Sequence, residues 1–162
     1  MVGVDSPASD KGDSCGIIVC GALADGRALV LADCSVEGER PEGWARAVKA
    51  AAETWGTERV VAEVVNGGQM VESVLRAAAA GMPVTPVHAS RGKAARAEPV
   101  ALLFETGRCL FAGAFPELED ELTGFSPGGF AGRGSPDRAD AMVWAMTELT
   151  LKPRGMARVR AL

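Results

Sequence analysis

The sequence predicts an α/β domain with a mixed central sheet, in which three antiparallel strands are followed by parallel strands and flanking helices. Two patterns indicate this class. Apolar runs joined by a tight turn open the chain, and later strand-like runs alternate with helix-like apolar stripes. The 162 residues are 48% hydrophobic and 23% charged, which suits one soluble domain with a real core.

Three short strands are expected at the amino terminus. They are Met1–Val4, Gly16–Gly21 and Ala28–Ala32. Residues 6–14 are mostly small and polar, which predicts a loop between the first two strands. The Asp25-Gly26 pair favours a hairpin between the next two, because both residues tolerate positive φ.

The middle of the chain predicts a helix followed by a strand, a second helix and another strand. The first helix begins at Pro41, and its apolar stripe consists of Trp44, Val48, Ala51, Ala52 and Trp55. The later elements are a strand over Arg59–Val65, a turn at Asn66-Gly-Gly, a helix carrying Met70 to Ala78, and a strand over Val84–His88. Strand, helix and strand in this order imply a parallel crossover.

The last third predicts shorter elements and one long helix. They are a helix near Pro99 that Gly107 stops, a strand over Arg108–Phe111, a helix over Pro116–Leu122 and a helix over Pro136–Leu149. Residues 124–134 are so rich in glycine that we expect a mobile loop. The last helix is apolar nearly all round, which indicates burial against the sheet. Residues 1–151 form the expected domain, and the basic tail 152–162 is expected to be flexible.

Four acids lie where strands end or on the last helix, namely Asp5, Glu63, Asp137 and Asp140. Strand ends project side chains from a sheet edge, and a helix start can face them. Acids far apart in sequence can therefore converge around hard divalent cations, which prefer oxygen ligands. Glu63 lies among valines, where a charge needs a partner. Asp137 and Asp140 share a helix face and repel each other unless a cation lies between them.

Three of these acids also have a purely structural interpretation. Asp5 suits the start of a turn. Glu63 suits an exposed edge position. Asp137 suits a helix start with Ser135 as N-cap and Pro136 at the first helical position. Asp140 is too far into the helix for a capping role.

Three basic residues, Arg91, Lys93 and Arg96, precede the helix near Pro99. They are expected in a loop, which is either simply solvated or, if it lies beside the acids, able to bind DNA phosphates. For the single histidine, His88, we expect a structural role.

Charge and composition exclude several classes of protein. The net charge is −4, and the last eleven residues hold four basic residues and no acid, so the remainder carries −8. Such a body does not suit a constitutive nucleic-acid binder, so any DNA contact must be local or assisted by metal. The four cysteines lack paired C-x-x-C spacing, which predicts free buried thiols rather than a zinc site. No signal peptide or membrane span is visible, so we expect a cytoplasmic protein.

The expected elements, with acids on the first strand, the fourth strand and the final helix, describe a ribonuclease H-like fold. Over residues 1–149 the chain resembles the C-terminal nuclease domain of phage terminase large subunits, the motors that package and cut viral DNA. The blocks that carry the resemblance are Val2-Gly-Val-Asp, Val61-Ala-Glu-Val-Val-Asn-Gly-Gly, His88-Ala-Ser-Arg-Gly-Lys, Arg96-Ala-Glu-Pro, Leu118-Glu-Asp-Glu and Ser135-Pro-Asp-Arg-Ala-Asp-Ala-Met-Val-Trp-Ala.

The resemblance implies a metal-dependent endonuclease that cuts double-stranded DNA with little sequence preference. Two Mg²⁺ or Mn²⁺ ions would be held by the four acids, with Asp5 bridging both, Glu63 on one ion, and Asp137 and Asp140 on the other. The resemblance leaves open which of these two aspartates is the closer ligand. Arg91, Lys93 and Arg96 would grip the DNA backbone.

The resemblance also implies a setting. The expected partners are a portal protein and a small terminase subunit, and the isolated domain is expected to be monomeric. No G-x-x-x-x-G-K-S/T loop occurs in the sequence, so we expect an excised domain or a stand-alone relative. Two alternatives remain open. One is a nuclease resembling Holliday-junction resolvases, which end in a similar pair of aspartates, and the other is a docking module with little activity of its own.

Overall fold

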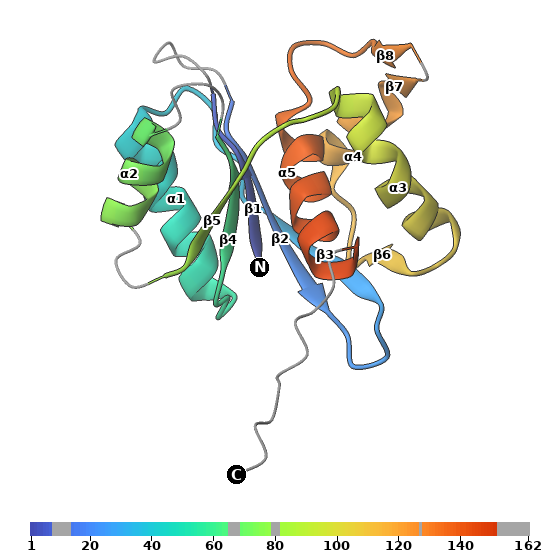
Figure 1. The fold of residues 1–162 in the computed structure, drawn as a ribbon, viewed down its shortest axis with the longest axis horizontal. Helices are drawn as coiled ribbons and strands as arrows, with labels where there is room; N and C mark the ends of the chain where they lie inside the picture. The colour runs from blue at the N-terminus through green and yellow to red at the C-terminus, as the bar shows by residue number, and fades with distance from the viewer. Residues whose placement is uncertain (8–13, 65–68, 79–81, 127, 152–162) are drawn as a thin grey trace.

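A six-stranded mixed sheet forms the centre of the computed structural model, which describes residues 1–7, 14–64, 69–78, 82–126 and 128–151 (Figure 1). Its strands are β1 (Val2–Asp5), β2 (Gly16–Ala22), β3 (Ala28–Asp33), β4 (Val60–Glu63), β5 (Val84–Val87) and β6 (Cys109–Phe111). The helices are α1 (Pro41–Thr54), α2 (Gln69–Ala78), α3 (Lys93–Glu105), α4 (Pro116–Thr123) and α5 (Asp137–Met146), and a π-helical turn, η1 (Thr147–Leu151), continues α5. Helices α1 and α2 cover one face of the sheet, and α3, α4 and α5 lie on the other.

The strand order is β5-β4-β1-β2-β3-β6, which places β1 near the middle of the sheet. Strands β1, β2 and β3 pair antiparallel in succession. Strand β4 pairs parallel with both β1 and β5, and β6 pairs parallel with β3. The predicted mixed sheet is therefore confirmed, including the hairpin at Asp25-Gly26, where Gly26 has φ +89°.

Two apolar cores lie on opposite faces of the sheet. Trp44 of α1 fills the core under α1 and α2, and Met142 and Met146 of α5 fill the other. Trp55 lies beyond the end of α1 and is 43% exposed, so the predicted apolar stripe ends at Ala52. The prediction that α5 is buried is confirmed, because it packs directly on the central strands.

Two glycines allow this close packing of α5. A Cβ atom at Gly3 of β1 would overlap the carbonyl oxygen of Ala141. A Cβ atom at Gly16 of β2 would overlap the carbonyl oxygen of Asp137. The backbone of α5 therefore rests directly on β1 and β2, which brings its first turn to the end of β1.

Helix α3 begins at Lys93 rather than near Pro99, so the prediction of a loop over its first residues is wrong. The Arg96 N–H donates to the Gly92 carbonyl at 3.2 Å, which starts the helix, and Pro99 lies inside it. Proline lacks an N–H, so it withdraws the usual helical donor from the Ala95 carbonyl.

Residues 124–134 also differ from the prediction of a loop without fixed structure. Strands β7 (Phe125–Ser126) and β8 (Gly129–Phe130) form an antiparallel hairpin. The rings of Phe125 and Phe130 lie 5.3 Å apart, and Phe125 packs against the core beneath α5. These aromatic contacts supply the order that the glycines alone would not.

Other predictions have mixed outcomes. Cys15, Cys20 and Cys109 are buried free thiols, as predicted, whereas Cys34 is partly exposed. Burial raises the pKa of Cys20 to about 12, so this thiol is protonated at neutral pH.

The predicted turn at Asn66-Gly-Gly and the tail 152–162 lie outside the described residues. Among the described helices, none has the length and apolar character to cross a bilayer.

Candidate metal centre

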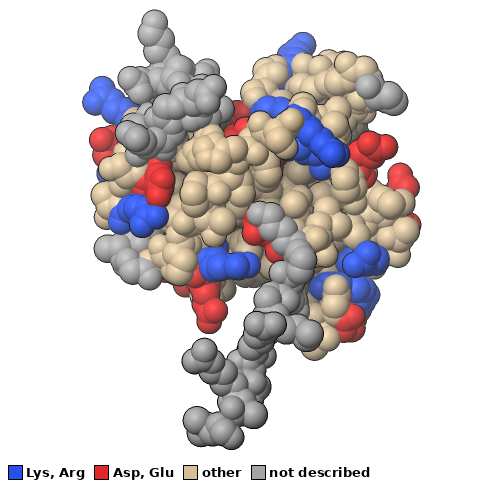
Figure 2. All heavy atoms as spheres, viewed as in Figure 1, with Lys and Arg blue, Asp and Glu red and all other residues tan. Residues whose placement is uncertain are grey.

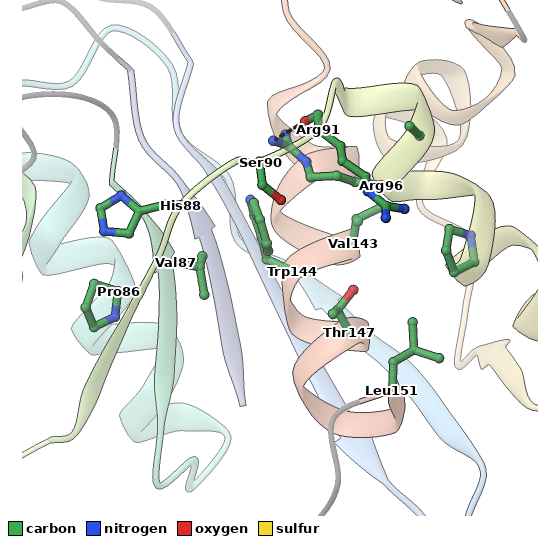
Figure 3. A pocket seen from close by; sticks show the side chains of 12 residues that line it. Pro86, Val87, His88, Ser90, Arg91, Arg96, Val143, Trp144, Thr147 and Leu151 are labelled. Carbon is green, nitrogen blue, oxygen red and sulfur yellow. Dashed lines mark hydrogen bonds between the residues drawn. The ribbon is translucent and has the colours of Figure 1, made fainter.

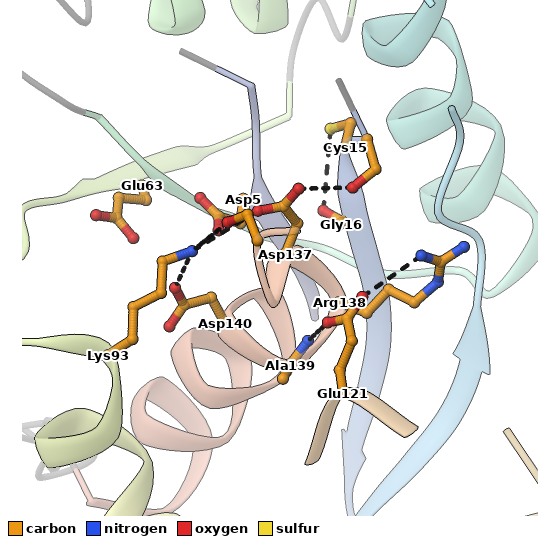
Figure 4. A network of polar contacts seen from close by, with 12 residues as sticks. Asp5, Cys15, Gly16, Glu63, Lys93, Glu121, Asp137, Arg138, Ala139 and Asp140 are labelled. Atoms are coloured by element: carbon orange, nitrogen blue, oxygen red, sulfur yellow. Dashed lines mark hydrogen bonds and ion pairs between the residues drawn. The ribbon is translucent and has the colours of Figure 1, made fainter. Parts of the chain in front are cut away.

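The four acids meet at one edge of the sheet (Figure 4). Asp5 ends β1 and Glu63 ends β4, and because these strands are parallel neighbours, both carboxylates emerge at the same edge. Asp137 and Asp140 lie on the first turn of α5, which starts beside that edge. All four are at most 9% exposed, and Asp140 is fully buried. The predicted convergence of the acids is therefore what the structure shows.

Three of the acids converge more closely than the fourth. Oxygen atoms of Asp5, Glu63 and Asp140 all lie within 4.8 Å of one another. Asp137 lies to the side of this group, where the Ser14 hydroxyl donates to its Oδ2 at 2.6 Å. Of the two helix aspartates, Asp140 is thus the one grouped with Asp5 and Glu63.

The ammonium group of Lys93 lies among these carboxylates. Its Nζ is 2.6 Å from Asp140 Oδ2, 3.1 Å from Asp5 Oδ2 and 3.7 Å from Asp137 Oδ1. It also donates to the Ser135 hydroxyl at 3.0 Å, so Ser135 does not cap α5 as the sequence predicts. Burial alone would lower the pKa of Lys93, but Asp5 and Asp140 outweigh burial and raise it.

Arg96 joins the cluster from the next turn of α3. Its Nη2 lies 2.9 Å from Asp140 Oδ1 and 3.3 Å from Glu63 Oε2. Its guanidinium group stacks 4.7 Å from the Trp144 ring centroid, and the Trp144 Nε1–H donates to Glu63 Oε2 at 2.8 Å. Trp144 is a residue of the site that the sequence did not predict, although its position four residues after Asp140 places it on the same helix face.

Two cations for four buried carboxylates leave an excess of negative charge at this edge. Burial raises the pKa of Asp5, Lys93 opposes this shift, and the charges of Asp140, Glu63 and Asp137 add to it, so that the pKa is about 7. Removing such groups from water is costly unless opposite charge is close. The metal-centre cluster, defined as these four acids with Lys93 and Arg96, is thus suited to take up additional positive charge.

Arg91 lies apart from the acids, so the structure does not bring all three predicted basic residues together. It is exposed and lines a groove of about 420 Å³ together with His88 and Ser90. Arg96 and Trp144 line the same groove, which therefore adjoins the metal-centre cluster (Figure 3).

A second cavity, of about 530 Å³, opens directly onto Asp5, Asp137 and Lys93. It is also lined by four charged residues that the sequence did not indicate as site residues, namely Glu37, Glu121, Arg133 and Arg138. Glu121 and Arg138 lie in two of the sequence blocks quoted above, but nothing in their spacing indicates that the side chains meet.

Comparisons with known proteins identify the family and the fold of the chain. Residues 2–149 match the family described as "Terminase RNaseH-like domain". The large terminase nuclease from thermophilic phage G20c, with bound magnesium, has a TM-score of 0.70 and 21% sequence identity, and the match covers 91% of this chain and 81% of that chain. RuvC of T. thermophilus in complex with a Holliday junction substrate has a TM-score of 0.55 and 18% identity, with 90% of each chain covered. A search of curated protein sequences gives no match.

The structural matches have low sequence identity, so they bear on the fold alone, and together with the family match they confirm the predicted ribonuclease H-like fold. The family match is broader evidence, because it spans the chain from β1 to η1 and includes all four acids. The chain therefore belongs to the family of terminase ribonuclease H-like domains.

Proposed function

We propose that this domain is a metal-dependent endonuclease that cuts double-stranded viral DNA within a terminase large subunit. The observation that carries the proposal is the convergence of buried carboxylates at one sheet edge, with oxygen atoms of three of them within 4.8 Å of one another. Support comes from the similar nuclease of phage G20c, which is known with magnesium, cobalt or zinc bound.

The residues present fit a divalent cation. All the candidate ligands are carboxylates, which suit hard ions such as Mg²⁺ and Mn²⁺. The Lys93 ammonium marks the position for a cation, because its Nζ lies within 3.1 Å of both Asp5 and Asp140. A metal ion cannot bind at that position while the Lys93 ammonium occupies it.

The geometry favours a different division of ligands from the one that the resemblance implies. We assign Glu63 and Asp140 to one ion, because their oxygen atoms converge with those of Asp5. Asp137 is not part of that group and is the candidate ligand for a second ion, and Asp5 would then serve both ions. Under this proposal Asp137 and Asp140 would serve different ions rather than the same one.

Bound divalent ions would lower the pKa of an attacking water and stabilise the leaving oxygen of the phosphodiester. Asp5, Glu63, Asp137 and Asp140 supply the fixed negative charge that holds such ions. Once displaced from Asp5 and Asp140, the Lys93 ammonium is free to bind a DNA phosphate. Arg91 is already exposed on the adjoining groove. These contacts read phosphate rather than base edges, so cutting has little sequence preference.

The charge distribution predicts weak DNA binding by the domain alone. Lys93 and Arg96 are neutralised by acids, and the described Lys and Arg side chains visible in Figure 2 lie in separate groups rather than in one band. We propose that the domain acts as a monomer in the host cytoplasm, where a portal protein and a small terminase subunit hold it on DNA.

The test is cleavage of supercoiled plasmid with Mg²⁺, Mn²⁺ or EDTA. The native domain is compared with Asp5→Asn and Asp140→Asn, and with Asp120→Asn as control, since Asp120 is exposed on α4. We expect nicking and linearisation that require metal, a loss of at least about 100-fold in the first two variants, and no loss in the control. Equal cutting by all four proteins, or cutting in EDTA, would contradict the proposal.

A parallel panel of linear duplex, plasmid and four-way junction separates the related activities. We expect duplex and plasmid to be cut at least as well as the junction. A strong preference for the junction would instead indicate a resolvase, in line with the fold shared with RuvC. No cutting of any substrate, combined with tight binding to portal or small terminase subunit, would indicate a docking module.

A further inference from the structure

The amino-terminal end of α5 lacks a cap from its own segment. Pro136 occupies the N-cap position without a side-chain hydrogen bond, and the Ser135 hydroxyl accepts from Lys93 instead. The first N–H groups of a helix have no partner within the helix and need one elsewhere. One of them is satisfied from a different helix, since the Ala139 N–H donates to Glu121 Oε2 of α4 at 2.9 Å (Figure 4).

Glu121 also contacts the side chain that precedes Ala139. Its Oε1 lies 3.5 Å from Nη1 of Arg138, whose other nitrogens lie 3.2 Å from Asp33 Oδ2 and 3.3 Å from Glu37 Oε1. We call Arg138 with these three acids the Arg138 cluster. It ties the first turn of α5 to α4, to the end of β3 and to the segment after β3.

Arg138 and Ala139 are the two residues between Asp137 and Asp140. The side chains of successive helical residues project about 100° apart. Contacts that hold Arg138 and Ala139 from one side of the helix therefore fix the rotation of the turn that carries both aspartates. We propose that Glu121 is a positioning residue, which sets the orientation of Asp137 and Asp140 for metal binding. This inference rests on the proposed function, because it assigns Glu121 a role in that same metal site.

Burial of Glu121 agrees with such a role. Its side chain is 13% exposed, and burial raises its pKa even though the Ala139 N–H and Arg138 oppose that shift. Asp120, its neighbour in the same sequence block, is exposed instead. The two adjacent carboxylates therefore make a matched pair for experiment.

The experiment measures Mn²⁺ binding by electron paramagnetic resonance and thermal unfolding without metal. It compares the native domain with Glu121→Ala, Glu121→Gln and Asp120→Ala. Loss of a direct partner of a metal ligand typically weakens metal binding by about 10–100-fold. Glu121 acts through Ala139 and Arg138 instead, so we expect the lower figure, about a tenfold loss of Mn²⁺ affinity for Glu121→Ala. Glu121→Gln keeps an oxygen acceptor for the Ala139 N–H and should lose less, and Asp120→Ala should lose nothing.

A purely structural role would lower the unfolding temperature and leave Mn²⁺ affinity unchanged, and that result would overturn the inference. If Glu121→Ala does not fold, Glu121→Gln and Arg138→Gln are measured in its place. Mn²⁺ affinity equal to that of the native domain in both variants would also overturn the inference. Failure of the proposed function gives a different result. In that case the native domain either binds no Mn²⁺ or binds it equally well after Asp140→Asn.

Discussion

The metal-centre cluster and the Arg138 cluster share the first turn of α5, and each contains two more acids than bases. They differ in arrangement. In the first, oxygen atoms of three acids lie within 4.8 Å of one another, and each of its four acids is at most 9% exposed. The acids of the second surround one guanidinium group, and the side chain of Glu37 is 71% exposed to water. Convergence and burial, rather than net charge, distinguish the proposed cation site from the contacts that hold the first turn of α5.

Gly16→Ala should disturb both clusters at once and have the largest effect. Its Cβ would overlap the carbonyl oxygen of Asp137 and press on the backbone N–H of Arg138, so the first turn of α5 must move. We expect a loss of about 3–5 kcal/mol in the free energy of unfolding, measured with urea, and loss of Mn²⁺ binding.

Gly113→Ala is the control for this prediction. Gly113 has no atoms near the position of an added Cβ, so the substitution should be nearly neutral. If Gly16→Ala has the same stability and Mn²⁺ affinity as Gly113→Ala, the two clusters do not depend on the packing of α5 against β2.

The raised pKa of Asp5 predicts that stability without metal depends on pH. The folded state binds the Asp5 proton until about pH 7, whereas the unfolded state releases it near pH 4. Between these values the folded state holds more protons, so stability falls as pH rises, by about 2–4 kcal/mol. Burial is the largest cause of the raised pKa, Glu63 of β4 and Asp137 and Asp140 of α5 add to it, and Lys93 of α3 opposes it.

Urea unfolding in EDTA across this pH range measures the effect. Asp5→Asn should flatten the dependence and make the metal-free domain more stable than the native one at pH 8. A native stability that rises from pH 4 to pH 7 by the same amount in both proteins would show that Asp5 ionises normally.

Lys93→Met should have the smallest effect and sharpen the contrast between the clusters. Removing the ammonium leaves Asp5 and Asp140 without their nearest cation, so the metal-free unfolding temperature should fall. Mn²⁺ should then bind about tenfold more tightly, because no internal cation competes with it. This change corresponds to about 1.4 kcal/mol of binding free energy. Lys49→Met is the control, since Lys49 forms an exposed pair with Glu53. Unchanged or weaker Mn²⁺ binding in Lys93→Met would argue against the competition.

Much of the fold and the four acids could be predicted from the sequence because they depend on local patterns. Alternating apolar runs and the Asp25-Gly26 turn indicate the first strands, and parallel strands that end in Asp5 and Glu63 must present both at one edge. Asp140 stood out as a charge among apolar residues in a helix. These inferences need only period and chain order.

The rest depends on contacts between distant segments, which no local pattern records. Pro99 suggested the start of a helix, but side chains one and two turns earlier already contact the acids. Glu121 lies 18 residues from the N–H that it caps, and Arg138 lies 105 residues from Asp33. Ser135 fits a cap by sequence, yet its hydroxyl accepts from Lys93.

Anomalous diffraction from crystals soaked in Mn²⁺ would locate the metal itself. We expect an anomalous peak bounded by the carboxylates of Asp5, Glu63 and Asp140, with the Lys93 ammonium moved away from them. If saturating Mn²⁺ gives no peak at that position and Lys93 remains among the carboxylates, or if a peak occurs only at the Arg138 cluster, the four acids do not form a metal site.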